Sequence, residues 1–159
     1  MAALVGLAIV VVQIALGGWV SSNYAALACV DLPTCHGVWF PDMDFRHGFE
    51  LVRELGRTAD GGHLAYEALT AIHWTHRVGA LVTFICVGAL AVALMRLPAL
   101  RRHGAALAAL LAVQVGLGIA NVAAGLPLAV AVAHNAVAAL LLVSLVVINF
   151  HLSRASSPS

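Results

Sequence analysis

The stretch "AIHWTHRVGALV", residues 71 to 82, places two histidines and an arginine at the start of a run that is otherwise apolar as far as Met95. These residues are His73, His76 and Arg77. An ionisable side chain inside a membrane-spanning helix is costly, so it normally faces the interior of a helix bundle and has a partner or a function there. The rest of the sequence must show whether this run crosses a membrane and what the polar residues could meet.

The composition is that of a membrane protein. The chain has 159 residues, of which 62% are hydrophobic, and its mean hydropathy is +0.99, whereas soluble domains are roughly 45 to 50% apolar. About 20 apolar residues are needed to cross a hydrocarbon core of about 30 Å. Four such stretches lie at about 3–20, 69–95, 105–124 and 128–150. We therefore predict an all-α, polytopic membrane four-helix bundle, a single domain over 1–159, with one long loop at 21–67.

The charges predict the orientation of these spans. All 7 acidic residues lie between the first and second spans, whereas Arg96, Arg101 and Arg102 lie between the second and third, and Arg154 follows the fourth. Because short basic loops stay in the cytoplasm, both termini should be cytoplasmic and the acidic loop should face outward from a bacterial inner membrane. The first span has no basic region before it and no clear cleavage site after it, so we expect it to be retained. A net charge of +1 and the lack of lysine give no reason to expect a nucleic-acid partner.

A short pattern occurs twice. Gln, an aliphatic residue, a small residue, Leu and Gly run from Gln13 to Gly17 and again from Gln114 to Gly118. This pattern is compatible with two helical hairpins related by duplication. The signal is weak, and the favoured interpretation, which does not exclude duplication, is that the small residues let helices approach closely in lipid.

The long loop contains two cysteines and one apolar pattern. Cys29 and Cys35 have five residues between them, and on the oxidising side of the membrane such a pair favours a disulfide. A metal or redox pair and two free thiols are the alternatives, and Cys86 within the second span is expected to be a small buried apolar residue. The segment "FELVRELG", residues 49 to 56, suggests a short amphipathic helix, on the membrane surface or in solvent.

Two histidines lie at similar depths in different spans. His76 in the second span and His134 in the fourth are within roughly 5 Å of each other along the membrane normal at 1.5 Å per residue. Two level imidazoles suit one ligand between them, and helix bundles bind haem iron through two such axial ligands. A zinc or copper site would need further ligands, which Cys86 and Asn135 are not well placed to supply. The competing interpretation is that the histidines only bridge helices.

The other two polar residues of the opening stretch have open roles. His73 projects about 60° away from His76 on the same side of the helix, so it could be an alternative ligand, a proton carrier or a hydrogen-bond partner of the ligands. Arg77 suits a haem propionate, which it can bind in bidentate fashion. Snorkelling of Arg77 to the membrane surface is the alternative.

Three segments together resemble the haem A synthase family, specifically its carboxyl-terminal four-helix half. They are "LGGWVSSNYAALACVDLPTCHGVWFPDMDF", "IHWTHRVGALVTF" and "AHNAVAALLL". Members of that family have eight spans in two homologous halves and oxidise the methyl group at carbon 8 of haem O to the formyl group of haem A, for cytochrome oxidase assembly. The resemblance implies haem b held by His76 and His134 as axial ligands, and a disulfide between Cys29 and Cys35.

Two departures from the family pattern bear on function. The chain begins with a span of its own and has no upstream half, so we expect a truncated or half-size form that pairs with a second four-helix half or with another copy. In the family's amino-terminal half a glutamate stands three residues before the ligand histidine, whereas here that residue is His73. The resemblance places the substrate pocket mainly in the other half, so no residue of this chain is assigned a catalytic role.

The leading hypothesis is a haem-binding domain of a haem A synthase, an oxidoreductase when completed by its other half, with haem O as substrate and haem A as product. One rival is a haem b electron-transfer subunit that has the same ligands and no catalysis of its own. The other rival is a structural or assembly subunit of the membrane that binds no haem.

Overall fold

The computed structural model describes residues 1–155, which form four long helices and two short ones. The long helices are α1 (Ala2–Ser22), α3 (Tyr66–Met95), α4 (Arg101–Ala123) and α5 (Leu128–Ala155), and the short ones are α2 (Phe45–Gly48) and the 3-10 helix η1 (Pro98–Leu100). Four helices are long and apolar enough to cross a membrane. The predicted all-α architecture, with a long segment between the first and second spans, is confirmed.

The helices extend beyond the apolar runs from which they were predicted. For example, α3 begins at Tyr66 rather than at residue 69. Its first turn includes Glu67, whose negative charge is favourable beside the exposed N–H groups of a helix N-terminus. At a helix C-terminus, α1 ends at Ser22, and the side chain of Asn23 donates a hydrogen bond to the carbonyl of Trp19 (2.9 Å). The ends of these helices therefore include polar residues, so a hydropathy pattern alone places the helix boundaries too far inward.

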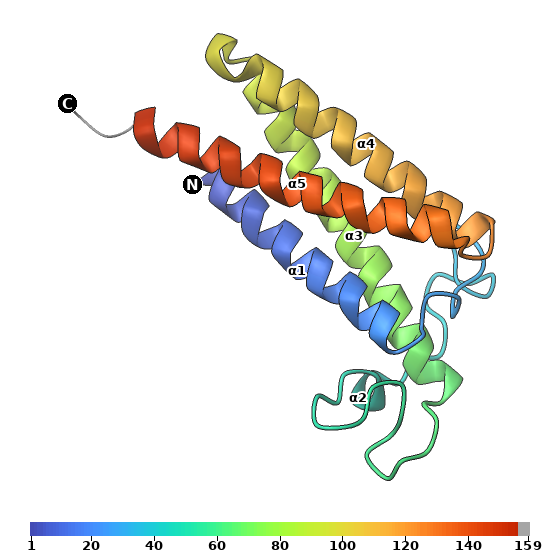
Figure 1. Ribbon diagram of the computed structural model, residues 1–159. Coiled ribbons are helices and arrows are strands. Elements are labelled where there is room, and N and C mark those ends of the chain that lie inside the picture. Colours follow the sequence, from blue (N-terminus) through green and yellow to red (C-terminus); the bar gives the residue numbers. More distant parts are fainter. Residues whose placement is uncertain (156–159) are drawn as a thin grey trace.

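The four long helices form a closed ring (Figure 1). In this ring α1 packs against α3 and α5, and α4 packs against the same two helices. Within residues 1–155, the diagonal pairs α1 with α4 and α3 with α5 are not direct neighbours. The start of α1, the end of α5 and the turn between α3 and α4 lie at one end of the bundle, and segment 23–65 lies at the other. We call these ends the terminal end and the loop end.

The apolar core fills the half of the bundle nearest the terminal end. Its buried side chains come from all four long helices and are Ala3, Val10, Val87, Leu90, Ala91, Leu94, Leu107, Leu111, Leu141, Leu145 and Ile148. Toward the loop end, Leu111 is the last buried residue of α4 and Leu141 is the first of α5. Residues 112–123 and 128–140 therefore contribute no fully buried side chain, so the loop-end half is packed less tightly.

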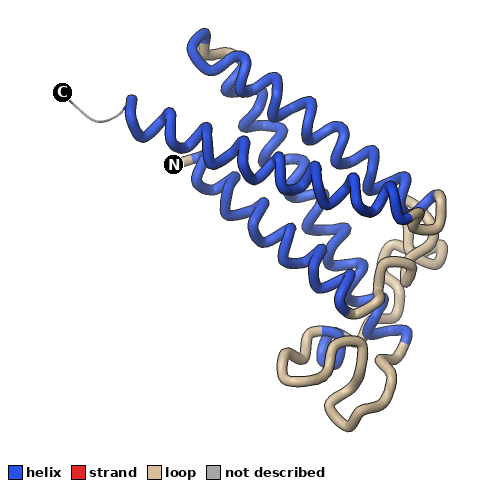
Figure 2. The backbone as a smooth tube through the Cα atoms, viewed as in Figure 1, coloured by secondary structure: helices blue, strands red, loops and turns tan. Residues whose placement is uncertain are grey.

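Segment 23–65 is mostly irregular (Figure 2) and is anchored on the ends of α1 and α3. The indole N–H of Trp19 donates to the carbonyl of Gly48 (2.9 Å), and the Asn23 side chain accepts from the N–H of Gly56 (3.2 Å). A small apolar cluster joins the segment to the two helices through Val20, Ala25, Leu64, Ala68 and Ile72. The segment is thus a structured cover at the loop end.

The predicted amphipathic helix at residues 49–56 is wrong, because the helix in this segment is α2, which ends at Gly48. The Asp44 carboxylate begins α2 by accepting the N–H of His47 (3.1 Å). Gly48 lies so close to α3 that an added Cβ would be 2.9 Å from the Ala68 carbonyl oxygen. Phe49 then packs inward, whereas Val52 is 90% exposed. The apolar residues of 49–56 therefore do not share one buried face.

Cys86 is also placed differently from the sequence expectation. Its side chain is exposed on the outside of the bundle rather than buried between helices. Because it lies within a span, this outward face would meet lipid, where a small sulfur-containing side chain is as acceptable as in a protein core.

Candidate functional site

His76 on α3 and His134 on α5 lie in the loop-end half of the bundle. The helices that carry them are diagonal to each other, and both imidazoles are partly buried. The structure therefore places the two intramembrane histidines that the sequence singled out in the same half of the bundle, on opposite helices that do not contact each other directly.

Gln13 on α1 holds His76. Its amide nitrogen lies 3.0 Å from Nδ1 of His76 and donates to the backbone carbonyl of the same residue at 3.1 Å. Because an amide nitrogen only donates, Nδ1 is the acceptor here and the proton of the neutral ring is on Nε2. One turn further along α1, Gly17 faces the same ring, and a Cβ added there would be 3.2 Å from Cε1 of His76.

A similar arrangement occurs around His134, except that the amide faces the other ring nitrogen. The amide nitrogen of Gln114 on α4 lies 3.2 Å from Nε2 of His134, and a Cβ added at Gly118 would be 3.3 Å from Cε1 of that ring. The Nδ1 atom of His134 is buried and has no hydrogen-bond partner among the described residues. Each histidine is thus placed by a glutamine and a glycine, one turn apart on a neighbouring helix.

His73 is turned toward segment 23–65 rather than toward His134. It is 5% exposed, and its two ring nitrogens lie 3.2 Å from the backbone N–H of Cys29 and 3.3 Å from Nε of Arg77. A neutral imidazole accepts at only one nitrogen, so either Cys29 or Arg77, and not both, donates a hydrogen bond to the neutral ring of His73. Both ring nitrogens nevertheless face groups at the loop end, and neither faces His134 in a hydrogen bond.

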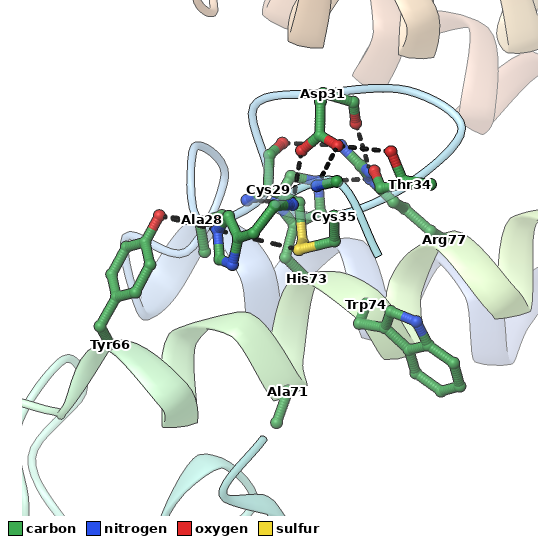
Figure 3. Close-up of a disulfide and its surroundings, with 12 residues drawn as sticks. Ala28, Cys29, Asp31, Thr34, Cys35, Tyr66, Ala71, His73, Trp74 and Arg77 are labelled. Carbon is green, nitrogen blue, oxygen red and sulfur yellow. Dashed lines mark hydrogen bonds between the residues drawn. A yellow bond between two sulfur atoms is a disulfide. The ribbon is translucent and has the colours of Figure 1, made fainter. Parts of the chain in front are cut away.

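Arg77 anchors the loop at residues 29–35, which we call the cysteine loop (Figure 3). Its guanidinium donates to three backbone carbonyls, those of Cys29 (2.6 Å), Asp31 (2.8 Å) and Thr34 (2.8 Å). With the contact to His73, four of its five N–H groups have a partner. The sequence offered a propionate contact or snorkelling for this arginine. The structure adds a third role, which is to fix the loop onto α3.

Cys29 and Cys35 form a disulfide with sulfurs 2.00 Å apart, as predicted. Within the small loop that it closes, the carboxylate of Asp31 accepts from the hydroxyl of Thr34 (2.5 Å) and from the N–H groups of His36 (2.7 Å) and Gly37 (2.9 Å). These donors stabilise the charged form, and the Thr34 hydroxyl contributes most, so the pKa of Asp31 is held well below its usual range. The loop is therefore tied together by a covalent bond and an ionised carboxylate.

The residues around the two histidines fit a haem better than a lone metal ion. Within residues 1–155, no group of three or more His, Cys, Asp or Glu side chains is placed to hold a metal ion. Three buried polar atoms without partners lie in the glutamine and histidine pairs, namely Oε1 of Gln13, Oε1 of Gln114 and Nδ1 of His134. Such unsatisfied atoms are rare in native interiors and point to a ligand or a functional rearrangement. A flat iron-centred group with two axial imidazoles matches this donor set.

Sequence reasoning found the histidines but missed the function of the glutamines. The signal was present, because the repeated pattern marked Gln13 with Gly17 and Gln114 with Gly118. Residues four apart share one face of a helix, but which side chain that face meets depends on the packing of α1 on α3 and of α4 on α5. That pairing is visible only in the fold.

Comparison with known proteins gives consistent results. Residues 1–146 match the family model COX15-CtaA, described as "Cytochrome oxidase assembly protein". The chain is 44% identical over 155 residues to the heme A synthase of Shewanella oneidensis, covering 98% of this chain and 47% of that protein. It is 35% identical over 148 residues to the heme A synthase of Rhizorhabdus wittichii, covering 90% and 38% respectively. No solved structure shows a significant match. The chain thus spans less than half the length of either relative.

Proposed function

The chain belongs to the cytochrome oxidase assembly protein family, and from this premise we propose that it is a haem-binding four-helix part of a haem A synthase. In this proposal His76 and His134 bind a haem b, and the complete enzyme oxidises the C8 methyl group of haem O to the formyl group of haem A. The observation that carries the proposal is the pair of partly buried imidazoles on diagonal helices, each with its own glutamine and glycine.

Each part of this chain has a defined task in the proposal. His76 and His134 each donate one ring nitrogen, and the apolar residues of the spans exclude water. When bound, the haem iron supplies a one-electron carrier. His73 and Arg77 hold the cysteine loop over the site. Arg77 also lines a hollow of about 190 Å³ with Trp39, Phe40 and Trp74, so we retain it as a contact for a haem propionate through its remaining N–H.

We further propose a location and a partner. Four spans make the chain a multi-pass membrane protein, and the arginines at the terminal end favour a cytoplasmic position for that end in a bacterial cell. The cover then faces outward, where its disulfide can persist. A second four-helix half, or another copy of this chain, completes the enzyme.

A second candidate is electron transfer without catalysis. Two axial histidines leave the iron no open position for a substrate, and each of the two histidines has a glutamine amide beside its ring. The haem in this chain would then pass electrons, and the oxidation of haem O would take place elsewhere or not at all.

One experiment separates these functions. The purified chain, supplied with haem b in detergent, should give the reduced-minus-oxidised spectrum of a low-spin haem, and a chain that binds no haem would overturn the proposal in favour of a structural subunit. Membranes that also contain the half of a relative that this chain does not match should convert haem O to haem A. Haem binding without conversion in any such combination would favour the electron-transfer function.

A further inference from the structure

The two glutamines of the chain occur at equivalent places. The sequence contains only Gln13 and Gln114, and each contacts one of the two histidines at the centre of the site. Each lies nine residues before its helix ends, at Ser22 for α1 and at Ala123 for α4. The glutamines occupy one diagonal of the helix ring and the histidines occupy the other.

Both glutamines have a side-chain oxygen that accepts no hydrogen bond within residues 1–155. The amide nitrogens face the imidazoles, whereas the Oε1 atoms are buried without a hydrogen-bond partner among the described residues. In this arrangement each ring nitrogen that faces an amide must accept a hydrogen bond, so the ring proton is on the other nitrogen. That other nitrogen, Nε2 in His76 and Nδ1 in His134, is the one left to bind iron, and a protonated nitrogen cannot be a ligand.

Iron ligation therefore requires the ring proton to move to the nitrogen that faces the glutamine. The amide must then accept rather than donate, and a half-turn about its last bond achieves this by exchanging Nε2 for the unpartnered Oε1. For Gln13 the same half-turn gives up the hydrogen bond from Nε2 to the backbone carbonyl of His76. A glutamine can serve both forms of the histidine. A glutamate can only accept and an apolar side chain can do neither.

We propose that Gln13 and Gln114 are a matched pair of positioning residues. Each glutamine donates a hydrogen bond to its histidine when the histidine is free, and accepts one from it when the histidine binds iron. The proposal rests on the proposed function, because it concerns how His76 and His134 are oriented for haem. Gly17 and Gly118 complete each cradle, since a side chain at either position would press on the ring edge. Hydrogen bonds of this kind orient ligand imidazoles and raise their basicity.

The test compares Gln13→Met and Gln114→Met with wild type. Methionine has a similar length and is apolar, so each variant should lose haem roughly 10- to 100-fold more readily and should shift part of the spectrum from low spin to high spin. The electron paramagnetic resonance g values should also change, since they report the angle between the two ring planes. The matched control is Asn149→Leu, which removes an amide that bridges α5 to Ala3 and Leu145 carbonyls at the terminal end and should alter none of these properties.

Gln13→Glu is a second variant, which strengthens the acceptor beside His76 instead of removing it. A carboxylate that accepts from the ligated ring increases its negative character, so the haem should remain low spin with a lower midpoint potential than wild type. A purely structural role for the glutamine would not produce a directed change in potential. An equal or higher potential in this variant would overturn the acceptor role.

The outcomes separate the two proposals. If the wild-type chain binds no haem, the proposed function fails and this inference fails with it. If the wild-type chain binds low-spin haem and both methionine variants retain it with unchanged affinity, g values and potential, the proposed function stands and the positioning role is wrong.

Discussion

At the scale of single residues, the site is defined by small differences between neighbouring positions. Gly17 faces the ring of His76, whereas a Cβ added at Gly18 would meet nothing within 4 Å. On α4 the same contrast separates Gly118, which faces His134, from Gly116, which faces open space. On each helix, the glycine that faces no side chain therefore serves as a control for the glycine that contacts the imidazole.

Alanine at Gly17 or Gly118 should displace the facing imidazole by a few tenths of an ångström, because the added Cβ would be only 3.2 or 3.3 Å from Cε1. Haem bound to Gly17→Ala or Gly118→Ala should be partly high spin and held less tightly. Gly18→Ala and Gly116→Ala should be spectroscopically indistinguishable from wild type. Equal behaviour of all four variants in an optical titration with haem would count against the cradles.

Arg77→Leu should release the cysteine loop without removing a histidine ligand. The change leaves three carbonyls without their charged donor, at a cost of about 1–3 kcal/mol to the docking of the loop. A membrane-impermeant reductant should then reduce the disulfide of Cys29 and Cys35 about fivefold faster or more. Arg77→Lys keeps the charge but lacks the planar fork, so it should give an intermediate rate. A rate unchanged in Arg77→Leu would show that the loop does not depend on this anchor.

At the scale of elements, the structure is a pair of two-helix units closed by a cover. The pair α1 and α3 and the pair α4 and α5 each join a glutamine helix to a histidine helix. The connection within the first pair is long and forms the cover, whereas α4 and α5 are joined by a short turn. One insertion between α1 and α3 therefore distinguishes two otherwise equivalent units.

The cover should lose its order in acid. Because the pKa of Asp31 is depressed below its ordinary value of 3.8 by the hydroxyl and N–H donors around it, its contribution to stability is present above that value. The contribution is lost as the pH falls below 3.8 and the native carboxylate becomes protonated. Hydrogen exchange at His36 and Gly37, corrected for intrinsic rates, should show protection from neutral pH to about pH 4 and a decline below it. Asp31→Asn should reduce this protection at neutral pH, and an acid-independent protection in wild type would contradict the assignment.

The orientation of the spans gives a second test at this scale. A reporter fused after Arg102, at the start of α4, should read cytoplasmic, and one inserted at Asp60 in the cover should read periplasmic, because the arginines lie at the terminal end and the acidic residues in the cover. The reverse pattern would place the disulfide on the reducing side and the site near the wrong membrane surface.

At the scale of the whole molecule, the features that depend on local composition were predictable. The four spans follow from apolar runs, and the disulfide follows from two cysteines in the long segment between the first and second spans. The partners of His73 and Arg77 were not predictable, because they are backbone groups of a loop more than 40 residues earlier, as in the contact of Arg77 with Cys29 at a separation of 48. The pairing of Gln13 with His76 spans 63 residues and also depends on which helices become neighbours.

The incomplete apolar core agrees with the proposed binding of haem in the loop-end half. Buried side chains fill the terminal half, whereas α4 and α5 contribute none in the loop-end half. Native interiors are close-packed, so a half that contains partly buried histidines and glutamines and few buried apolar residues is suited to hold a large group rather than to stabilise the fold. The same division explains why substitutions at the histidines should be tolerated by the bundle.

The central claim is that His76 and His134 are the two axial ligands of one haem. The most direct measurement is the low-temperature electron paramagnetic resonance spectrum of the haem-loaded chain, compared with those of His76→Ala, His134→Ala and His73→Ala. Wild type and His73→Ala should show one low-spin, six-coordinate haem. Each of the other two variants should become high spin or lose the haem, with the helical content of the bundle unchanged. If both His76→Ala and His134→Ala keep the unaltered low-spin signal, the ligand assignment is wrong, and His73 is the first alternative ligand.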